Sequence, residues 1–71
     1  FKPFTWLIQQ HQIIFNSFET GNLYLVDMSG KVLLNWLVPL NTQLITKTLE
    51  KGIYLMVFKT PNKQYTEKII F

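Results

Sequence analysis

The sequence has no cysteine, no arginine and only three glycines among its 71 residues. Without cysteine, neither disulfides nor thiolate-bound metals can stabilise the fold, and thiol chemistry is excluded. Without arginine, the chain lacks the side chain that most often reads bases and phosphates through paired hydrogen bonds. Three scattered glycines also leave no glycine-rich loop that could cradle a phosphate. These absences argue against thiol-dependent, phosphate-binding and nucleic-acid-binding proteins.

Residues that could carry catalysis are also few. His11 is the one histidine, and it lies in a polar segment with no nearby acid. A metal site needs three or four ligands, and a serine triad needs a nucleophile, a histidine and an acid in register. Neither pattern is present, and no Gly-x-Ser-x-Gly segment occurs. We therefore expect no enzymatic activity, no metal, no cofactor and no small-molecule substrate.

Long hydrophobic runs are missing as well. The longest uninterrupted apolar run, from Ile53 to Phe58, has six residues, whereas a membrane-spanning helix needs about 20. The start of the chain has no basic segment followed by an unbroken apolar stretch, so no signal peptide is predicted. The chain begins at Phe1 rather than at a methionine, so we expect a processed product or a fragment of a longer protein.

The residues that are present favour a small folded domain. Hydrophobic residues make up 48% of the chain and aromatic residues 15%, which is too apolar for a disordered segment and enough to pack one core. The formal net charge is +3, and the lysines lie mostly near predicted turns. We interpret them as solvated charges that protect strand edges and loop tips.

Short apolar runs recur at a spacing of roughly ten residues, separated by polar breaks or by breaks with glycine or proline. No stretch has the i, i+3, i+4, i+7 apolar spacing of an amphipathic helix. The pattern predicts an all-β fold, either a sandwich or a small barrel. The expected strands cover residues 4–8, 13–18, 23–28, 31–38, 41–46, 53–59 and 64–71.

The segment from Leu23 to Leu34 is the clearest hairpin signal. Two apolar runs flank Ser29-Gly30, and glycine supplies a positive φ without steric cost. A two-residue turn is therefore expected, with a longer loop that includes Asp27, Met28 or Lys31 as the alternative. In either case we expect the Asp27 carboxylate to accept backbone N–H groups of the turn.

The strand predicted at residues 53–59 is apolar on both faces, although an outer strand of a sandwich should alternate. In the loop before it, Leu49 is expected to plug one end of the core, and Gly52 to need a positive φ or a close backbone approach. An outward apolar row usually marks a partner or a neighbouring domain. Two sets could face outward: either Ile53, Leu55 and Val57, or Tyr54, Met56 and Phe58.

Three segments carry a family resemblance. The string Leu-Tyr-Leu-Val-Asp-Met-Ser-Gly-Lys-Val-Leu, beginning at Leu23, resembles the hairpin of type A C-terminal sorting domains of the type IX secretion system in Bacteroidetes. Residues 49–57 resemble the family's Leu-x-x-Gly-Ile-Tyr segment, and residues 62–70 its closing strand, in which a lysine precedes an apolar pair. The sequence departs from the family at Val26, which is often tyrosine, in lacking the opening Tyr-Pro-Asn-Pro, and in ending at Phe71 rather than at a basic residue.

The resemblance implies a small immunoglobulin-like antiparallel β-sandwich of about seven strands, with residues 1–71 as a single domain at the end of a longer secreted protein. It implies a non-catalytic signal that crosses the periplasm and is recognised there by the outer-membrane translocon and its shuttle barrel. A sortase-like peptidase then cleaves the domain as its cargo is attached to the cell surface or released. Neither a nucleic acid nor a small molecule is among the implied partners.

We expect the last two strands to bind the partner, and the motif residues to set the backbone geometry. The expected recognition residues are Ile53, Leu55, Val57, Lys68, Ile69 and Ile70. The expected motif residues are Asp27, Gly30, Lys31, Gly52 and Tyr54. Two other functions stay open. One is an immunoglobulin-like accessory or adhesion module that binds glycan, through an aromatic platform, or a protein partner at the cell surface. The other is a small basic β-barrel that binds nucleic acid.

Overall fold

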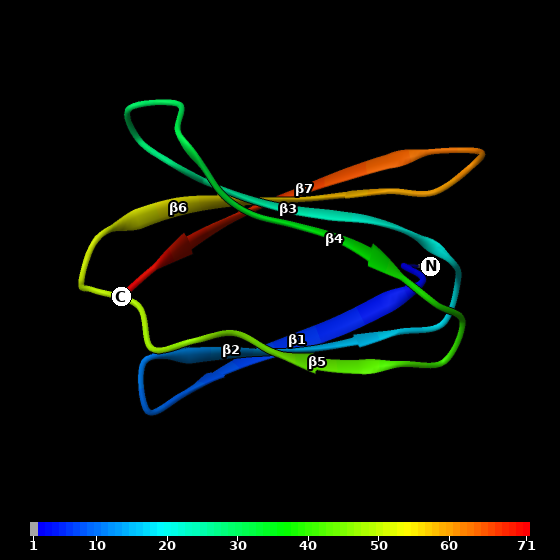
Figure 1. Ribbon diagram of the computed structural model, residues 1–71, viewed down its shortest axis with the longest axis horizontal. Coiled ribbons are helices and arrows are strands. Elements are labelled where there is room, and N and C mark those ends of the chain that lie inside the picture. The colour runs from blue at the N-terminus through cyan, green and yellow to red at the C-terminus, as the bar shows by residue number, and fades with distance from the viewer. Residues whose placement is uncertain (1) are drawn as a thin grey trace.

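Residues 2–71 form seven strands in two layers (Figure 1). The computed structural model describes residues 2–71, and Phe1 lies outside this range. One antiparallel sheet has the order β1-β2-β5 and the other the order β4-β3-β6-β7. Within residues 2–71, no helix is long and apolar enough to cross a membrane. The predicted all-β sandwich is confirmed, and its strands are β1 (Phe4–Gln9), β2 (Gln12–Ser17), β3 (Gly21–Asp27), β4 (Val32–Val38), β5 (Gln43–Ile45), β6 (Ile53–Lys59) and β7 (Gln64–Ile70).

The strand order is related to that of immunoglobulin domains. With strands lettered A to G, a constant-type domain pairs A-B-E-D in one sheet and C-F-G in the other. Here the sheets are A-B-E and D-C-F-G, because the fourth strand stays paired with the third through their hairpin. The larger sheet therefore holds β6 and β7, the two strands predicted to bind the partner, beside the β3–β4 hairpin.

Three phenylalanine rings join the two sheets at the centre of the core. Phe4 and Phe15, from the three-stranded sheet, stack with ring centroids 5.4 Å apart. Phe58, from the four-stranded sheet, meets Phe15 edge-on at 5.2 Å and Phe4 at 5.7 Å. All three side chains are buried, and edge-to-face contacts of this kind add to the burial of apolar area. Because side chains alternate along β1, β2 and β6, one inward phenylalanine from each strand meets in a single aromatic cluster.

Gly21 leaves the space that Phe58 occupies. A Cβ atom at Gly21 would lie 2.5 Å from the Lys59 carbonyl oxygen and 2.9 Å from the Phe58 ring. Real Cβ atoms do not approach other atoms this closely, so any larger residue would force backbone or ring to move. Gly21, the first residue of β3, is the register partner of Val38, the last residue of β4. The close packing of Phe58 against Gly21 therefore also fixes the position of this end of the β3–β4 hairpin over the core.

The β3–β4 hairpin closes through a loop longer than the expected two-residue turn. The Asp27 N–H donates to the Lys31 carbonyl at 3.0 Å, and the Gly30 N–H donates to the Asp27 carbonyl at 3.1 Å. Gly30 has a φ of 89°, which fits a type I turn followed by a left-handed residue. A register shift follows, in which Leu25 faces Leu34 but Val26 faces Val32. The longer loop is therefore the correct alternative: Met28 and Lys31 join it, whereas Asp27 is the last residue of β3.

The β1–β2 turn has an unusual backbone. Gln10 and His11 have φ values of 52° and 62°, the left-handed region that residues other than glycine seldom adopt. Two contacts hold the turn: the His11 carbonyl accepts the Leu49 N–H at 2.8 Å, and the His11 ring stacks on Phe71 at 6.0 Å. A break between the expected strands at residues 4–8 and 13–18 was predicted, whereas its left-handed conformation was not.

Two buried hydroxyl groups fasten the segments around β5. The Ser17 hydroxyl donates to the Pro39 carbonyl at 2.9 Å and accepts the Thr42 N–H at 3.2 Å. The Thr46 hydroxyl accepts the Ile13 N–H at 2.9 Å and donates to the Lys47 carbonyl. These bonds satisfy groups that would otherwise be costly to bury, and they allow β5 to be shorter than the predicted 41–46.

The close approach at Gly21 generates a stability prediction. We expect Gly21→Ala to lower the free energy of unfolding by about 2–3 kcal/mol, because the added methyl group overpacks the Phe58 contact. Gly52→Ala is a matched control, since a Cβ there meets only the Tyr54 ring at an ordinary 3.7 Å. Its unfolding free energy should change by less than about 0.5 kcal/mol. Urea denaturation followed by tryptophan fluorescence measures both, and equal losses in the two variants would contradict the packing argument.

Candidate docking surface

The doubly apolar strand β6 turns one row of its side chains into the core and the other outward. Tyr54, Met56 and Phe58 are buried, whereas Ile53 and Leu55 are 36% and 37% exposed. Val57 lies on the same outward side and is half-buried. The structure thus decides between the two sets left open by the sequence: the row of Ile53, Leu55 and Val57 faces outward.

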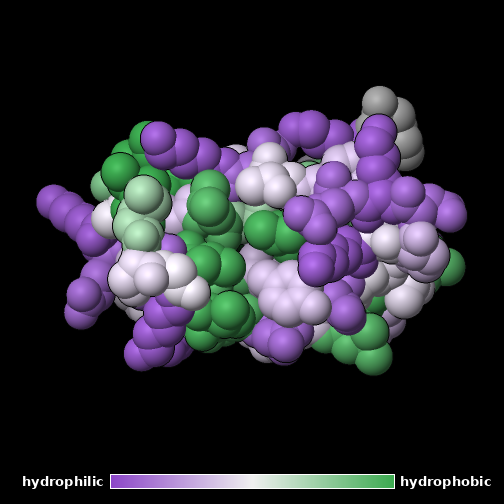
Figure 2. Space-filling view, turned by 90° about the horizontal axis from the view of Figure 1, so that it is seen from above, coloured by the Kyte–Doolittle hydropathy of each residue, from purple (hydrophilic) through white to green (hydrophobic). Residues whose placement is uncertain are grey.

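Neighbouring strands extend this row into a patch. Val26 pairs with Leu55 and with Val32, and Tyr24 pairs with Val57. Ile70 pairs with Ile53 and is 63% exposed. Figure 2 looks onto this side of the molecule, where hydrophobic side chains cross the sheet with hydrophilic ones on either side. We call this patch the outer face; its apolar members are Tyr24, Val26, Val32, Ile53, Leu55, Val57 and Ile70. Leu37, the register partner of Asn22, is 77% exposed on the same side of the sheet but lies outside this patch.

The charged side chains on the outer face are lysines. Lys68 pairs with Leu55 across β6 and β7, and Lys59 follows Val57 on the same side of β6. The Lys59 ammonium lies 5.4 Å from the centre of the Tyr24 ring, within range of a cation–π contact. Glu67 points to the opposite side of β7, where it pairs with Lys2. Among the described strands of this sheet, the outer face therefore carries positive charge and no carboxylate.

Two of the predicted site residues lie elsewhere. Ile69 is fully buried, because it shares the inward side of β7 with its register partner Tyr54; the expectation that its side chain contacts a partner is wrong for the folded domain. Gly52 has neither a positive φ nor a close approach, which corrects the reason proposed for it. Its carbonyl instead accepts the Phe71 N–H at 3.0 Å.

Asp27 organises the hairpin loop. Its Oδ1 atom accepts the Ser29 N–H at 2.9 Å, the Ser29 hydroxyl at 2.7 Å and the Lys31 N–H at 3.0 Å. The Ser29 hydroxyl bond, followed by the Lys31 N–H bond, lowers the pKa of the Asp27 carboxyl below its usual value. Asp27, Gly30 and Lys31 thus lie together at the hairpin loop, joined by these hydrogen bonds.

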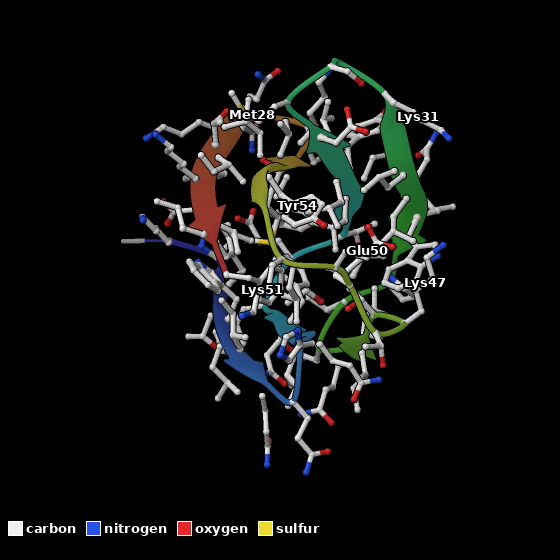
Figure 3. The ribbon with its side chains drawn as sticks, turned by 90° about the vertical axis from the view of Figure 1, so that its left-hand side faces the viewer. Met28, Lys31, Lys47, Glu50, Lys51 and Tyr54 are labelled. Carbon is white, nitrogen blue, oxygen red and sulfur yellow. The ribbon has the colours of Figure 1, made fainter. Side chains whose placement is uncertain are left out.

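Tyr54 closes the loop that precedes β6. Its hydroxyl donates to the Glu50 carbonyl at 2.6 Å, and Leu49 is buried in the core, as expected of a plug. Figure 3 looks onto this end of the sandwich, where Tyr54 lies beside the loop that carries Glu50 and Lys51. The Leu-x-x-Gly-Ile-Tyr segment is therefore a structural unit, in which the leucine and tyrosine fix the loop to the core.

The structure also adds residues that sequence reasoning missed. Tyr24, Val26 and Val32 belong to the outer face because of the β3–β4 and β3–β6 registers. The alternation of β3 was visible in the sequence, but the register shift after Leu25 was not. Gly21 was also not singled out from the sequence, although a Cβ there would make a closer contact than one at Gly30 or Gly52.

The alternative functions find less support in the arrangement of side chains. Phe4, Phe15, Tyr54 and Phe58 are buried, so they cannot stack on sugars or bases. No group of three or more acidic or histidine side chains that could hold a metal occurs within residues 2–71. The His11 ring stacks on Phe71.

Asp27 generates a pH prediction. Hydrogen bonds favour its charged form, so its stabilising effect is complete above the pKa of an unfolded aspartate and is lost as the pH falls through its lowered folded pKa. At neutral pH we expect Asp27→Asn to melt at a lower temperature than the natural sequence, with a difference that narrows on acidification. Glu50→Gln removes an exposed charge as the control. A difference that stays constant from pH 7 to pH 2 in circular dichroism melts would contradict this role.

Comparison with known protein families agrees with these motifs. The family model described as the secretion system C-terminal sorting domain matches residues 8–71, all but the first seven residues of the chain. No curated protein matches the chain at a significant level. The matched range includes the hairpin motif, the Leu49–Tyr54 unit and the closing strand. The chain therefore belongs to the family of type IX secretion system C-terminal sorting domains.

Proposed function

We propose that this domain is a non-catalytic sorting signal at the end of a longer secreted protein. The family match over residues 8–71 carries the proposal. Membership of the family indicates a C-terminal secretion sorting signal, exported to the cell surface or the extracellular space through the type IX machinery. The feature that we identify on the domain is a partly exposed apolar surface, the outer face. Such a surface supports a role in recognition by another protein.

In this proposal the folded domain is recognised in the periplasm by the outer-membrane translocon and its shuttle barrel. A sortase-like peptidase then cleaves it as the cargo is attached to the surface or released. Recognition takes place on the outer face, through Ile53, Leu55 and Val57 of β6 with Lys68 and Ile70 of β7. Partial exposure of this apolar row supports the assignment, because such patches on small domains mark interaction sites.

An export assay tests the sorting role. Residues 1–71 are fused behind a reporter that carries its own inner-membrane export signal, in a host with a working type IX system. We expect the reporter at the cell surface or in the medium, and in the periplasm when the host lacks the translocon. A reporter that stays periplasmic in the competent host, although the fused domain is folded, would count against the proposal.

A second experiment tests the outer face itself. The triple variant Ile53→Thr, Leu55→Thr, Val57→Thr keeps β-forming residues but removes apolar surface. We expect its export to fall about tenfold, since losing central apolar contacts from an interface commonly costs at least that factor.

The matched control makes the same change on the opposite sheet. Leu7→Thr and Ile45→Thr replace side chains that are 51% and 52% exposed on the outside of β1 and β5. Their export should equal that of the natural sequence. Melting temperatures establish that all variants are folded, and equal export by the triple variant and the control would remove the outer face from the proposal.

A further inference from the structure

The outer face contains a shallow hollow beyond the predicted β6 row. It is lined by Tyr24, Val26, Val32, Val57, Lys59 and Gln64. Three of these residues are valines from three strands, and the Tyr24 ring completes an apolar floor. The register shift in the β3–β4 hairpin places Val32, rather than Leu33, opposite Val26. The hairpin thus supplies one wall of a hollow whose floor belongs to β3 and β6.

Positive charge borders this apolar floor. Lys59 lines the hollow and keeps its ammonium 5.4 Å from the Tyr24 ring. Lys68 sits on the same side of β7, in register with Leu55 and thus with Val26. Glu67 is directed to the inner side of β7 and is engaged by Lys2. An apolar floor with lysines at its margin is complementary to apolar side chains that have carboxylates beside them.

The charge pattern also distinguishes between possible occupants. A second copy docked face to face would bring lysines toward lysines with no carboxylate on either face to pair them, and like charges at an interface are unfavourable. An anionic membrane would pair with the lysines, but it presents no discrete apolar side chain for the hollow to receive. A different protein that presents alternating apolar and acidic residues satisfies both the floor and its margin.

We propose that the hollow between β3, β4 and β6 receives an apolar side chain of an acidic partner protein, whose carboxylates lie against Lys59 and Lys68. The inference rests on the proposed sorting role and assigns the chemistry of the surface that reads the signal. Within it, Tyr24 and Val57 contact the inserted side chain, while the lysines orient the partner. Electrostatic complementarity of this kind chiefly sets specificity and the rate of association.

Peptide binding to the purified chain tests this chemistry. The probe is a short peptide that alternates leucine and glutamate, compared with versions that carry glutamine or lysine in place of glutamate. We expect amide shifts in nuclear magnetic resonance spectra around Tyr24, Val57 and Lys59 with the glutamate peptide, and weaker binding of the other two. Higher salt should weaken the glutamate peptide most, because it screens exposed charges.

Charge variants with a matched control sharpen the test. Lys59→Glu should weaken binding of the glutamate peptide roughly fivefold, since reversal replaces an attraction by a repulsion. Lys59→Arg should keep it within about twofold, because a guanidinium also carries the positive charge. Lys47→Glu makes the same change of net charge in the loop between β5 and β6, away from the outer face, and should leave affinity unchanged.

Several outcomes would overturn the inference. They are equal binding of the three peptides, equal loss in Lys59→Glu and Lys47→Glu, and shifts confined to the free edges of β4 and β7. Binding to phosphatidylglycerol vesicles without binding to the glutamate peptide would assign the face to a membrane. A dimer in sedimentation, abolished by the triple variant Ile53→Thr, Leu55→Thr, Val57→Thr, would assign it to a second copy. If any of these outcomes occurs while the reporter is exported normally, the sorting role stands and only the inference about the hollow fails. If export fails while the glutamate peptide binds as expected, only the sorting role is refuted.

Discussion

The contact of Phe58 with Phe4 and Phe15 is the interaction on which the rest of the domain depends. It is the central link between the two sheets, and it exists because Gly21 has no side chain where the Phe58 ring lies. With Phe58 inward, the alternation of β6 directs Ile53, Leu55 and Val57 to the outside. The outer face is therefore a geometric consequence of the core. A domain of this size buries a modest share of its surface and has little stability to spare, so core and surface are tightly linked.

Much of the fold follows from local patterns. Alternation and turn residues place all seven strands within two residues of their observed ends. Asp27 and Gly30 behave as a hairpin motif should, since their roles depend only on neighbours a few residues away. Pairing partners were harder to predict. The fourth strand joins the larger sheet, and nothing within residues 32–38 distinguishes that arrangement from the alternative.

The candidate site was also predicted only in part, because alternation is a local pattern and strand pairing is not. Ile53, Leu55 and Val57 were identified because their strand is apolar on both faces, whereas a two-layer sandwich buries only one face. Ile69 was wrongly included because the apolar pair at the end of β7 was treated as one feature, although adjacent residues on a strand face opposite ways. Val32 was missed because its position depends on a register shift of one residue, which the hydrophobic pattern does not encode. Tyr24 was missed because its place beside Val57 depends on which strands pair.

The β1–β2 turn has a consequence for the order in which the domain assembles. Gln10 and His11 adopt left-handed backbone angles that their side chains disfavour, so the turn cannot form early from local preference. Its supports, the Leu49 N–H and the Phe71 ring, come from residues far along the sequence, Phe71 being the last of them. Closing this turn must therefore await long-range contacts, which are slow to form. We expect a chain that folds in a single late step, so that a partner meets either an unfolded tail or a finished domain.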